Sequence, residues 1–339
     1  MRDKVFDVNG VDAYPGNSGE RSTVSETAWA LMRSMIRIRR VEERLARLFA
    51  DGEVPGFIHL SIGQEAIAAA FGACLTDADT VASTHRGHGH CLAKGVPVSA
   101  LVAEVMGRDS GACRGRGGSM HVADLARGML GANGIVGAGA PIALGSALAH
   151  KVSGRRAVAV AFFGDGAMAE GAVYETMNLA ALWQVPLVMV CERNGWSEFS
   201  PSDRAFAGDG AKLAEAFGLP FLALDGDDVL AVHAAVGPLV AACRDDRRPR
   251  LVSCATHRVA GHFEGDPQRY RDAPERAAAA AADPIMRLAA RLCVDEDRDA
   301  RARLDPIEAE ITAEIDAAVE AARLAPDPDF DLARGDVYG

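Results

Sequence analysis

The spacing of apolar residues changes along the chain and predicts the elements of the fold. Ser25 can cap a helix whose apolar residues recur at roughly helical spacing from Leu31 to Phe49. Between about residues 80 and 260, helical patterns alternate with apolar runs typical of strands, at 157–163, 185–191, 221–224 and 250–256. This alternation predicts an α/β fold with a largely parallel central sheet flanked by helices.

The two ends of the chain differ from this middle part. The first 24 residues are polar and are predicted to form a flexible tail, which leaves residues 25–339 as one domain with no dividing linker and no internal repeat. From about residue 275 the sequence is rich in alanine and charge, which predicts a helical C-terminal region. Five arginines on one face of the first helix are expected to contact solvent or another subunit: Arg33, Arg37, Arg40, Arg44 and Arg47.

Composition argues against several classes of protein. The chain has 339 residues, is 49% hydrophobic and carries a formal net charge of -11, which argues against a nucleic-acid-binding surface. No window approaches the roughly 18 apolar residues of a membrane helix, and the polar start does not resemble a secretory signal. The seven cysteines contain no C-x-x-C pair, which argues against a zinc knuckle or a disulfide framework. We therefore expect a cytoplasmic protein that binds neither nucleic acid nor membrane.

Two polar residues follow neighbouring predicted strands. Asp165 ends the run 157–163, and Asn194 ends the next run 29 positions later, the length of one βαβ unit. Right-handed crossovers place both at the carboxyl edge of the sheet, where ligands bind in such folds. A carboxylate and an amide oxygen beside a helix N-terminus suit Mg²⁺ together with a diphosphate. Taken alone, Asp165 could equally be an ordinary turn aspartate.

Several stretches resemble a known family. "GDG" followed about thirty residues later by Asn is the thiamine-diphosphate motif, and four further stretches match: "GFIHLSIGQEA", "STHRGHGHCLAKGV", "GRGGSMHVADLARGMLGANGIVGAGAP" and "HRVAGHFEGDPQRYR". From about residue 28 to its end, the chain resembles the alpha subunit of the thiamine-diphosphate-dependent component of acetoin and 2-oxo acid dehydrogenase complexes. The stretches "THRGHGHCLAKGV", "GMLGANGIVG" and "GHFEGDPQ" are most similar to the acetoin branch.

The resemblance implies a thiamine-diphosphate-binding fold and a role for each matching position. Asp165 and Asn194 would bind Mg²⁺ through their side chains, and Trp196 through its backbone carbonyl, where a Tyr is more common. His262 and His59 would be the catalytic pocket residues, with His262 also touching the cofactor. The remaining cofactor-binding positions would be the diphosphate-facing Gly166 and Ala167, the charge-binding Arg86 and Arg258 with His85 beside them, and the aminopyrimidine-facing Gly134 and Val136.

The family also implies a reaction and partners. The chain would act with a beta subunit, as a heterotetramer of two alpha and two beta chains, because the carboxylate that activates the cofactor belongs to the beta chain. It would cleave acetoin and pass the acyl unit oxidatively to a lipoyl-bearing acyltransferase. One alternative is a pyruvate or branched-chain 2-oxo acid dehydrogenase alpha subunit. Another is a non-catalytic scaffold that has lost its cofactor.

Some features leave alternatives open. Arg193 stands where the family usually has asparagine, so it could shape a turn, weaken the metal loop or add a diphosphate contact. The histidines of "HRGHGH", which are His85, His88 and His90, could be loop structure, cavity wall or zinc ligands. The glycines of "GANGIVGAG" do not follow the G-x-G-x-x-G order of a dinucleotide site, and no strand clearly precedes them.

Overall fold

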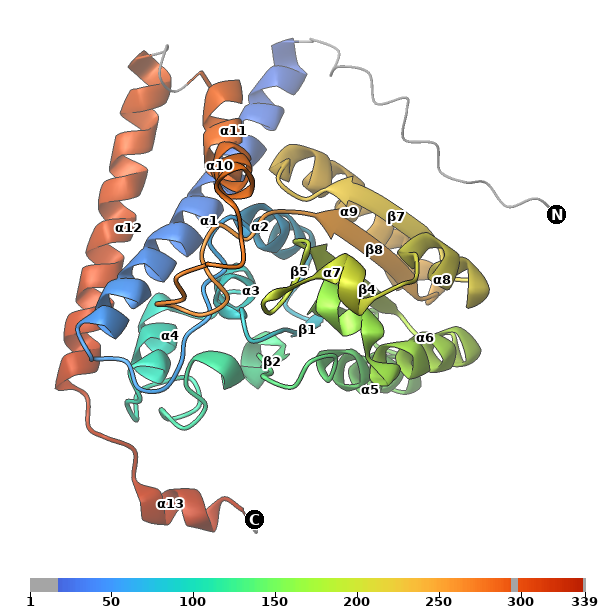
Figure 1. The fold of residues 1–339 in the computed structure, drawn as a ribbon, viewed down its shortest axis with the longest axis horizontal. Coiled ribbons are helices and arrows are strands. Elements are labelled where there is room, and N and C mark those ends of the chain that lie inside the picture. Colours follow the sequence, from blue (N-terminus) through green and yellow to red (C-terminus); the bar gives the residue numbers. More distant parts are fainter. Residues whose placement is uncertain (1–17, 294–297, 338–339) are drawn as a thin grey trace.

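A six-stranded parallel sheet forms the centre of the molecule (Figure 1). The computed structural model describes residues 18–293 and 298–337. The strand order is β2-β1-β3-β4-β8-β7, and the strands span Thr80–Ala82 (β1), Met129–Gly131 (β2), Ala159–Gly164 (β3), Leu187–Arg193 (β4), Phe221–Asp225 (β7) and Arg250–Ala255 (β8). The four predicted strands are confirmed. β1 and β2 have three residues each, too few to show a pattern in the sequence.

Helices cover both faces of the sheet because successive strand residues point to opposite sides. Val158, Val160 and Phe162 pack into one core with α2 (Glu65–Cys74), α4 (Val98–Val105) and α9 (Val229–Asp246). Ala159, Ala161 and Phe163 pack into a second core with α5 (Gly139–Val152), α6 (Gly171–Trp183) and α8 (Gly210–Ala216). Continuous apolar runs such as 157–163 are therefore buried on both faces, as expected for a parallel sheet.

The first helix, α1, spans Ser18–Ala50 and begins earlier than the sequence predicted. The expectation that Ser25 caps this helix is wrong, because Ser25 lies inside it. Residues 18–24 lack apolar periodicity, so their helical turns left no pattern to detect. Residues 1–17 of the predicted tail lie outside the described residues. The single domain over 25–339 stays a prediction.

The C-terminal region is helical, as predicted. It contains α10 (Ala273–Ala281), α11 (Pro284–Arg291), α12 (Arg298–Leu324) and α13 (Phe330–Gly335). In Figure 1, α12 lies beside α1 on the edge of the molecule away from the sheet, and α13 extends away from the body. None of the described helices is both long and apolar enough to span a membrane.

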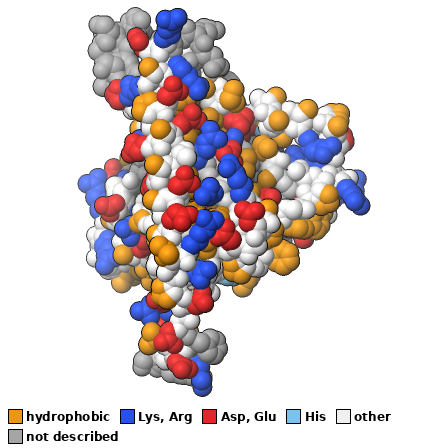
Figure 2. Space-filling view, turned by 90° about the vertical axis from the view of Figure 1, so that its left-hand side faces the viewer, with side chains coloured by type: hydrophobic (Ala, Val, Ile, Leu, Met, Phe, Trp, Pro, Cys, Tyr) orange, Lys and Arg blue, Asp and Glu red, His pale blue; other side chains and the backbone are white. Residues whose placement is uncertain are grey.

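The arginines of α1 contact α12, which corrects the expectation of a solvent- or subunit-facing surface. Four of the five pair with carboxylates of α12, in the pairs Arg33–Glu310, Arg37–Glu314, Arg40–Glu308 and Arg44–Asp316. The first two pairs have the same sequence separation of 277 residues, so the two helices run parallel. Figure 2 shows positive and negative side chains interspersed along this face. We call these four pairs the α1–α12 seam. Arg47, the fifth arginine, is exposed.

Candidate active site

The carboxyl ends of β3 and β4 open onto a cavity of about 270 Å³. Its wall contains eleven of the twelve site residues expected from the sequence: His59, His85, Arg86, Gly134, Val136, Gly166, Ala167, Asn194, Trp196, Arg258 and His262. Asp165, the twelfth, lines an adjoining cavity that also contains Arg193. These residues come from six separate stretches of sequence, and the crossovers of the parallel sheet bring them to one edge.

Asp165 and Asn194 meet where β3 and β4 end. The backbone N–H of Gly195 donates to Asp165 Oδ2 at 2.9 Å, which joins the two strand ends. Asn194 donates through Nδ2 to Gln64 Oε1 at 2.9 Å and accepts through Oδ1 from the N–H of Trp196 at 3.0 Å. Among the described residues, the buried Oδ1 of Asp165 has no hydrogen-bond partner. Burial raises the pKa of Asp165 even though Arg193 lies near enough to lower it, and its unpartnered Oδ1 leaves a position for a hard cation.

The segment after β3 differs from the expected helix start. A short 3-10 turn, η3 (Asp165–Ala169), precedes α6, so the amides beside the cavity belong to this turn and not to a helix N-terminus. A hairpin of β5 (Trp196–Ser197) and β6 (Ser200–Pro201) packs over it. A Cβ atom on Gly166 would lie 2.6 Å from Ser197 Oγ, so the close approach of the hairpin requires glycine there.

Arg86 and Arg258 are buried without a carboxylate among their hydrogen-bond partners in the described part of the chain. Arg86 donates to the carbonyl oxygens of Leu60 and His262, at 2.9 and 2.7 Å. Arg258 donates to the carbonyl oxygen of Glu198 and to the Tyr270 hydroxyl. Burial and the neighbouring Arg258 lower the pKa of Arg86 to about 9. Two buried guanidinium groups with no carboxylate bonded to them are costly unless an anion joins them, and phosphate oxygens suit their planar geometry.

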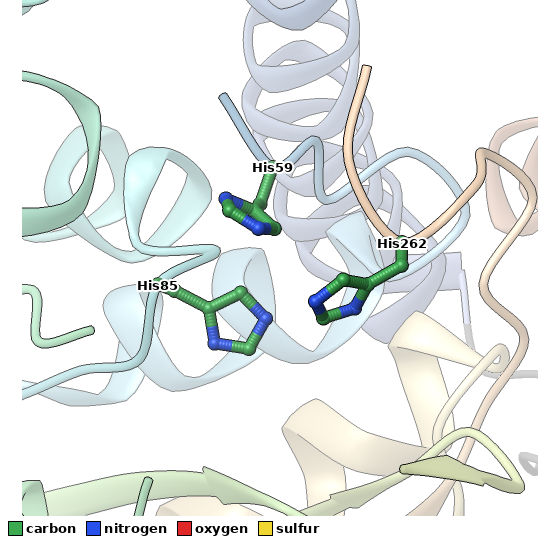
Figure 3. A group of neighbouring side chains, drawn as sticks. All are labelled: His59, His85 and His262. Carbon is green, nitrogen blue, oxygen red and sulfur yellow. The ribbon is translucent and has the colours of Figure 1, made fainter. Parts of the chain in front are cut away.

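His59, His85 and His262 form a cluster on the same wall (Figure 3). Their ring centroids lie 4.8 to 5.4 Å apart. Burial, together with the nearby Arg86, lowers the pKa of His59 to about 3, of His85 to about 2 and of His262 to about 4. The rings are therefore neutral at pH 7, and each can donate a hydrogen bond through one nitrogen and accept one through the other. Their nitrogens lie within 4.8 Å of one another, but the positive field of the arginines favours an anion here over a metal ion.

The zinc reading of "HRGHGH" is wrong, because its three histidines point to different places. His88 contacts Glu42 and Ser119, both at 2.9 Å. His90 lies 2.7 Å from Ser83 and stacks on Phe162. Only His85 of this motif lines the cavity, where it joins histidines that are distant in sequence.

Arg193 is exposed and lines the adjoining cavity, whose wall contains Asp165 but neither Arg86 nor Arg258. Its backbone carbonyl accepts from the N–H of Thr256 at 3.0 Å, which continues the pairing of β4 with β8. This position gives no support to a contact between Arg193 and an anion in the main cavity. It is compatible with a role in shaping the strand end.

The glycine-rich loop 133–137 also lines the cavity. Strand β2 directly precedes it and α5 follows it, so the expectation that no strand precedes the loop is wrong. Two of its side chains, Ile135 and Val136, are 70% and 52% exposed. Apolar side chains this exposed indicate a surface that another molecule covers.

The sequence reasoning missed several cavity residues. Gln64 and Met120 lie inside stretches that carry the family resemblance, so their positions could have been transferred with the rest. Glu192 is 4% exposed and its Oε1 lies 3.2 Å from His90 Nε2. Glu192 follows the apolar run 185–191, and that run does not show that the residue reaches the cavity. The position of β4 in the folded sheet does.

Comparison with known proteins agrees with this geometry. The family model described as "Dehydrogenase E1 component" matches residues 33–331. The chain therefore belongs to the dehydrogenase E1 component family of thiamine-diphosphate-dependent oxidoreductases. This confirms the resemblance and the fold inferred from the sequence.

Within this family, the chain is similar to alpha subunits. It is 44% identical to the alpha subunit of acetoin:2,6-dichlorophenolindophenol oxidoreductase of Cupriavidus necator, over 92% of this chain and 94% of that protein. The corresponding alpha subunit of Bacillus subtilis is 42% identical over 94% and 95%. The alpha-3 subunit of the pyruvate dehydrogenase E1 component of Arabidopsis thaliana, a chloroplastic protein, is 39% identical over 89% and 72%.

Proposed function

We propose that this chain is the alpha subunit of an acetoin dehydrogenase that uses thiamine diphosphate and Mg²⁺. The observation that supports the proposal is that buried groups of opposite charge in one site lack hydrogen-bond partners of complementary charge. Arg86 and Arg258 have no carboxylate among their hydrogen-bond partners in the described residues, and the buried Oδ1 of Asp165 has no partner there. A magnesium-bound diphosphate would satisfy both. The identity to two acetoin oxidoreductase alpha subunits favours acetoin over pyruvate as the substrate.

The residues of the site fit this cofactor. Asp165 and Asn194 would bind Mg²⁺ through side-chain oxygens, with the carbonyl of Trp196 as a third ligand. Arg86, Arg258 and the backbone amides of Gly166 and Ala167 would bind the diphosphate, beside His85. The loop at Gly134 and Val136 would contact the aminopyrimidine through its backbone. A scaffold that has lost its cofactor is disfavoured, because every one of these positions retains a side chain or backbone suited to the role.

The histidines would move the proton of the substrate hydroxyl. Thiamine diphosphate supplies a carbon nucleophile and an electron sink for cleavage of the bond beside the carbonyl. An anion bound by Arg86 and Arg258 would offset their charge and raise the pKa of these histidines toward the working pH, where general acid–base catalysis is most efficient. Arg86 contacts Nδ1 of His262 at 3.2 Å, which leaves Nε2 as the atom through which His262 exchanges a proton. His59 would offer Nδ1, which has no partner among the described residues.

A beta subunit would cover the cavity. Four large apolar side chains beside the cavity are more than 40% exposed: Phe57, Ile135, Val136 and Phe199. Such a patch around a site suits a protein partner, and the similarity to alpha subunits favours a beta subunit as that partner. The heterotetramer of two alpha and two beta chains stays a prediction from the sequence. The acyl unit would pass to a lipoyl-bearing acyltransferase. A cytoplasmic location stays a prediction from the sequence.

The test is substrate choice by the reconstituted pair of subunits. With the beta chain and an artificial electron acceptor present, we expect acetoin to be oxidised with a higher kcat/KM than pyruvate. We expect no turnover by the purified alpha chain alone. The reverse order of substrates, with release of carbon dioxide, would assign the protein to the 2-oxo acid branch. Turnover by the single chain would refute the shared site.

A further inference from the structure

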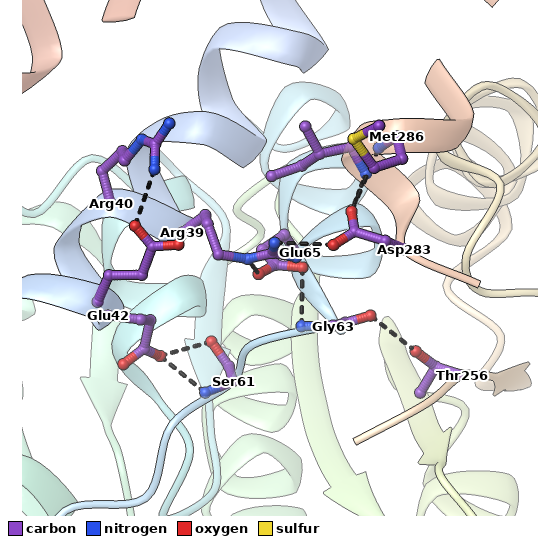
Figure 4. A network of polar contacts seen from close by, with 11 residues as sticks. Arg39, Arg40, Glu42, Ser61, Gly63, Glu65, Thr256, Asp283 and Met286 are labelled. Carbon is purple, nitrogen blue, oxygen red and sulfur yellow. Dashed lines mark hydrogen bonds and ion pairs between the residues drawn. The ribbon is translucent and has the colours of Figure 1, made fainter. Parts of the chain in front are cut away.

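Glu42 lies on the inner face of α1, opposite the seam, and its side chain is fully buried. Its Oε1 accepts hydrogen bonds from the Ser61 N–H at 2.9 Å and from the Ser61 hydroxyl at 2.6 Å (Figure 4). Its Oε2 lies 2.9 Å from Nδ1 of His88. One carboxylate of the first helix therefore contacts two segments that are 19 and 46 residues further along the chain.

The contact continues through His88 to a third segment. Nε2 of His88 lies 2.9 Å from the hydroxyl of Ser119, and His88 is fully buried. Because the carboxylate accepts from Nδ1–H, Nε2 carries a lone pair and accepts from the Ser119 hydroxyl. The result is a chain of hydrogen bonds from Glu42 to Ser61 on one side and through His88 to Ser119 on the other.

Each of the three contacted segments contributes residues to the wall of the cavity. His59 precedes Ser61 by two residues, His85 and Arg86 precede His88, and Met120 follows Ser119. Glu42 itself does not line the cavity. It is connected through one or two hydrogen bonds to segments that supply four of the cavity's residues.

The order Ser119–His88–Glu42 is also the order of a serine hydrolase triad. Ser119 is 6% exposed, however, and it is absent from the wall of the main cavity and of three further cavities in the described part of the chain. A nucleophilic serine must reach a substrate carbonyl. The burial of Ser119 therefore favours a role in positioning over a role in attack.

A second carboxylate, that of Glu65, adds another contact between α1 and the segment that contains Ser61. Glu65 accepts from the N–H of Gly63 at 3.0 Å, and Arg39 of α1 pairs with Glu65 (Figure 4). Gly63 has φ +97°, and a Cβ atom there would lie 2.5 Å from the carbonyl oxygen of His257. The segment that follows His59 is thus packed tightly and tied to the first helix at two points.

We propose that Glu42 is a positioning residue that fixes His59, His85 with Arg86, and Met120 relative to one another around the cavity. Oε1 accepts two hydrogen bonds while Oε2 accepts a third, a set that an apolar side chain of the same size could not satisfy. The cost of burying the carboxylate is offset by these bonds, and His88 holds the pKa of Glu42 below its usual range. The inference concerns how the site proposed above is assembled, and it rests on that proposal for its effect on turnover.

The experiment compares Glu42→Ala with Glu42→Gln in the full assembly. Alanine removes the carboxylate and leaves the N–H and hydroxyl of Ser61 and Nδ1 of His88 without their partner. We expect amide hydrogen exchange to rise about tenfold or more in segments 57–63, 84–88 and 117–121 together, the scale of one lost buried hydrogen bond. We expect kcat to fall by a similar factor. Glutamine can accept from Ser61 through its oxygen and donate to His88 through its nitrogen, so His88 would donate to Ser119 instead, and both readouts should return close to the parent values.

Arg37→Ala is the matched control, because Arg37 lies on the same helix but faces the seam. It should leave exchange in the three segments and kcat unchanged. If Glu42→Ala does not fold, Ser61→Ala and Ser119→Ala replace it. Each should loosen only its own segment, 57–63 or 117–121, and leave the other as in the parent.

Three results would overturn the inference. They are a rise confined to segment 57–63 in Glu42→Ala, a uniform rise that includes the central strand β4, and a loss in Glu42→Gln as large as in Glu42→Ala. Labelling of Ser119 by a fluorophosphonate would also overturn it, in favour of a nucleophilic serine. Calorimetry of the parent with thiamine diphosphate tests the proposed function separately, because absence of cofactor binding would leave the exchange pattern interpretable.

Discussion

Arginines at the α1–α12 seam and arginines in the cavity differ in what their guanidinium groups contact. At the seam, Arg33 and Arg37 each meet a carboxylate of α12 at 2.6 and 2.5 Å, and both partners remain partly exposed. In the cavity, Arg86 and Arg258 are at least 95% buried and bind backbone carbonyls, an imidazole and a hydroxyl. The seam is complete within the chain, whereas the cavity needs an anion from outside it.

This difference indicates which arginines contribute to stability and which contribute to function. Exposed ion pairs contribute little free energy each, so the seam serves to orient two helices whose apolar faces are already buried. Buried unpaired charges lower stability in the empty protein and become favourable when the ligand arrives. Changes in the cavity should therefore alter binding and turnover, and changes in the seam should alter stability slightly.

The largest expected effect is on turnover, at His262. His262→Ala should lower kcat by about 10²–10⁴-fold, the usual contribution of a proton-transfer group, while cofactor binding persists. Steady-state kinetics with the beta subunit and calorimetry with thiamine diphosphate would measure the two effects. His257, which pairs with Asp227 outside the cavity, supplies the control His257→Gln. Unchanged turnover in His262→Ala would show that His262 has a structural role. The cavity would then not differ from the seam in its effect on turnover.

Arg258→Met should separate ligand binding from stability. We expect thiamine diphosphate to bind about 100-fold more weakly, because a buried charge-assisted contact of this type is worth roughly 2–5 kcal/mol. The free energy of unfolding of the cofactor-free chain should not fall, because the variant removes an uncompensated buried cation. Calorimetry and urea unfolding measure the two quantities. A loss of stability together with unchanged affinity would show that Arg258 is a structural residue.

The two regions should respond to acid in different pH ranges. The pKa of His262 falls from 6.5 to about 4 in the folded protein, and those of His59 and His85 fall further. Below about pH 6.5 the unfolded chain therefore binds protons that the folded cavity does not, and stability is lost as the pH falls from 6.5 towards 4. The seam carboxylate Glu310 has a pKa lowered from 4.5 by Arg33, so its contribution is lost only below about pH 4.5.

Urea unfolding between pH 7 and 3.5 would resolve these ranges. His59→Gln should flatten the loss over the whole range from pH 6.5 to 3.5, because the folded pKa of His59 is about 3. Glu310→Gln should flatten it only below about pH 4.5. Identical profiles for the two variants would contradict the assignment of separate ranges.

The smallest effect is expected at the seam itself. Removing Arg33 and Arg37 together by substitution with alanine should lower the free energy of unfolding by about 0.4–2 kcal/mol, or 0.2–1 kcal/mol for each exposed pair. The loss should shrink as salt is added, since salt screens exposed pairs. Thermal unfolding at low and high ionic strength measures it, with Arg47→Ala as the control. A loss above about 3 kcal/mol would place the seam among buried ion pairs.

Sequence periodicity predicted the strands that are buried on both faces and the C-terminal helices, because these elements are long enough to repeat a pattern. It could not predict β1 and β2, which have three residues each, or the start of α1 at Ser18. Spacing alone placed Asp165 and Asn194 at one edge, and family resemblance supplied the loops and the histidines. The partners of the α1 arginines could not be predicted, because charged faces pair across the whole chain with no local signal.

The cluster of three histidines could not be predicted from sequence spacing either. His59, His85 and His262 lie on three loops, and only the folded backbone brings their rings within 5.4 Å of one another. Sequence spacing left open whether His85, His88 and His90 are loop structure, cavity wall or zinc ligands. Those residues diverge because His88 and His90 begin and continue a short helix, α3 (His88–Ala93), which turns both rings into the protein interior.

The parallel pairing of α1 with α12 has a consequence for the timing of folding. α1 is the first described helix to leave the ribosome, and the helix that covers its charged face is completed only at Leu324. Until then the nascent chain carries a row of unpaired arginines and part of an uncovered apolar face. Contacts of such long sequence separation form slowly, since the loop between them must close first. The long sequence separation of these two helices thus delays completion of this part of the fold until Leu324 has been synthesised, whatever the speed of the sheet.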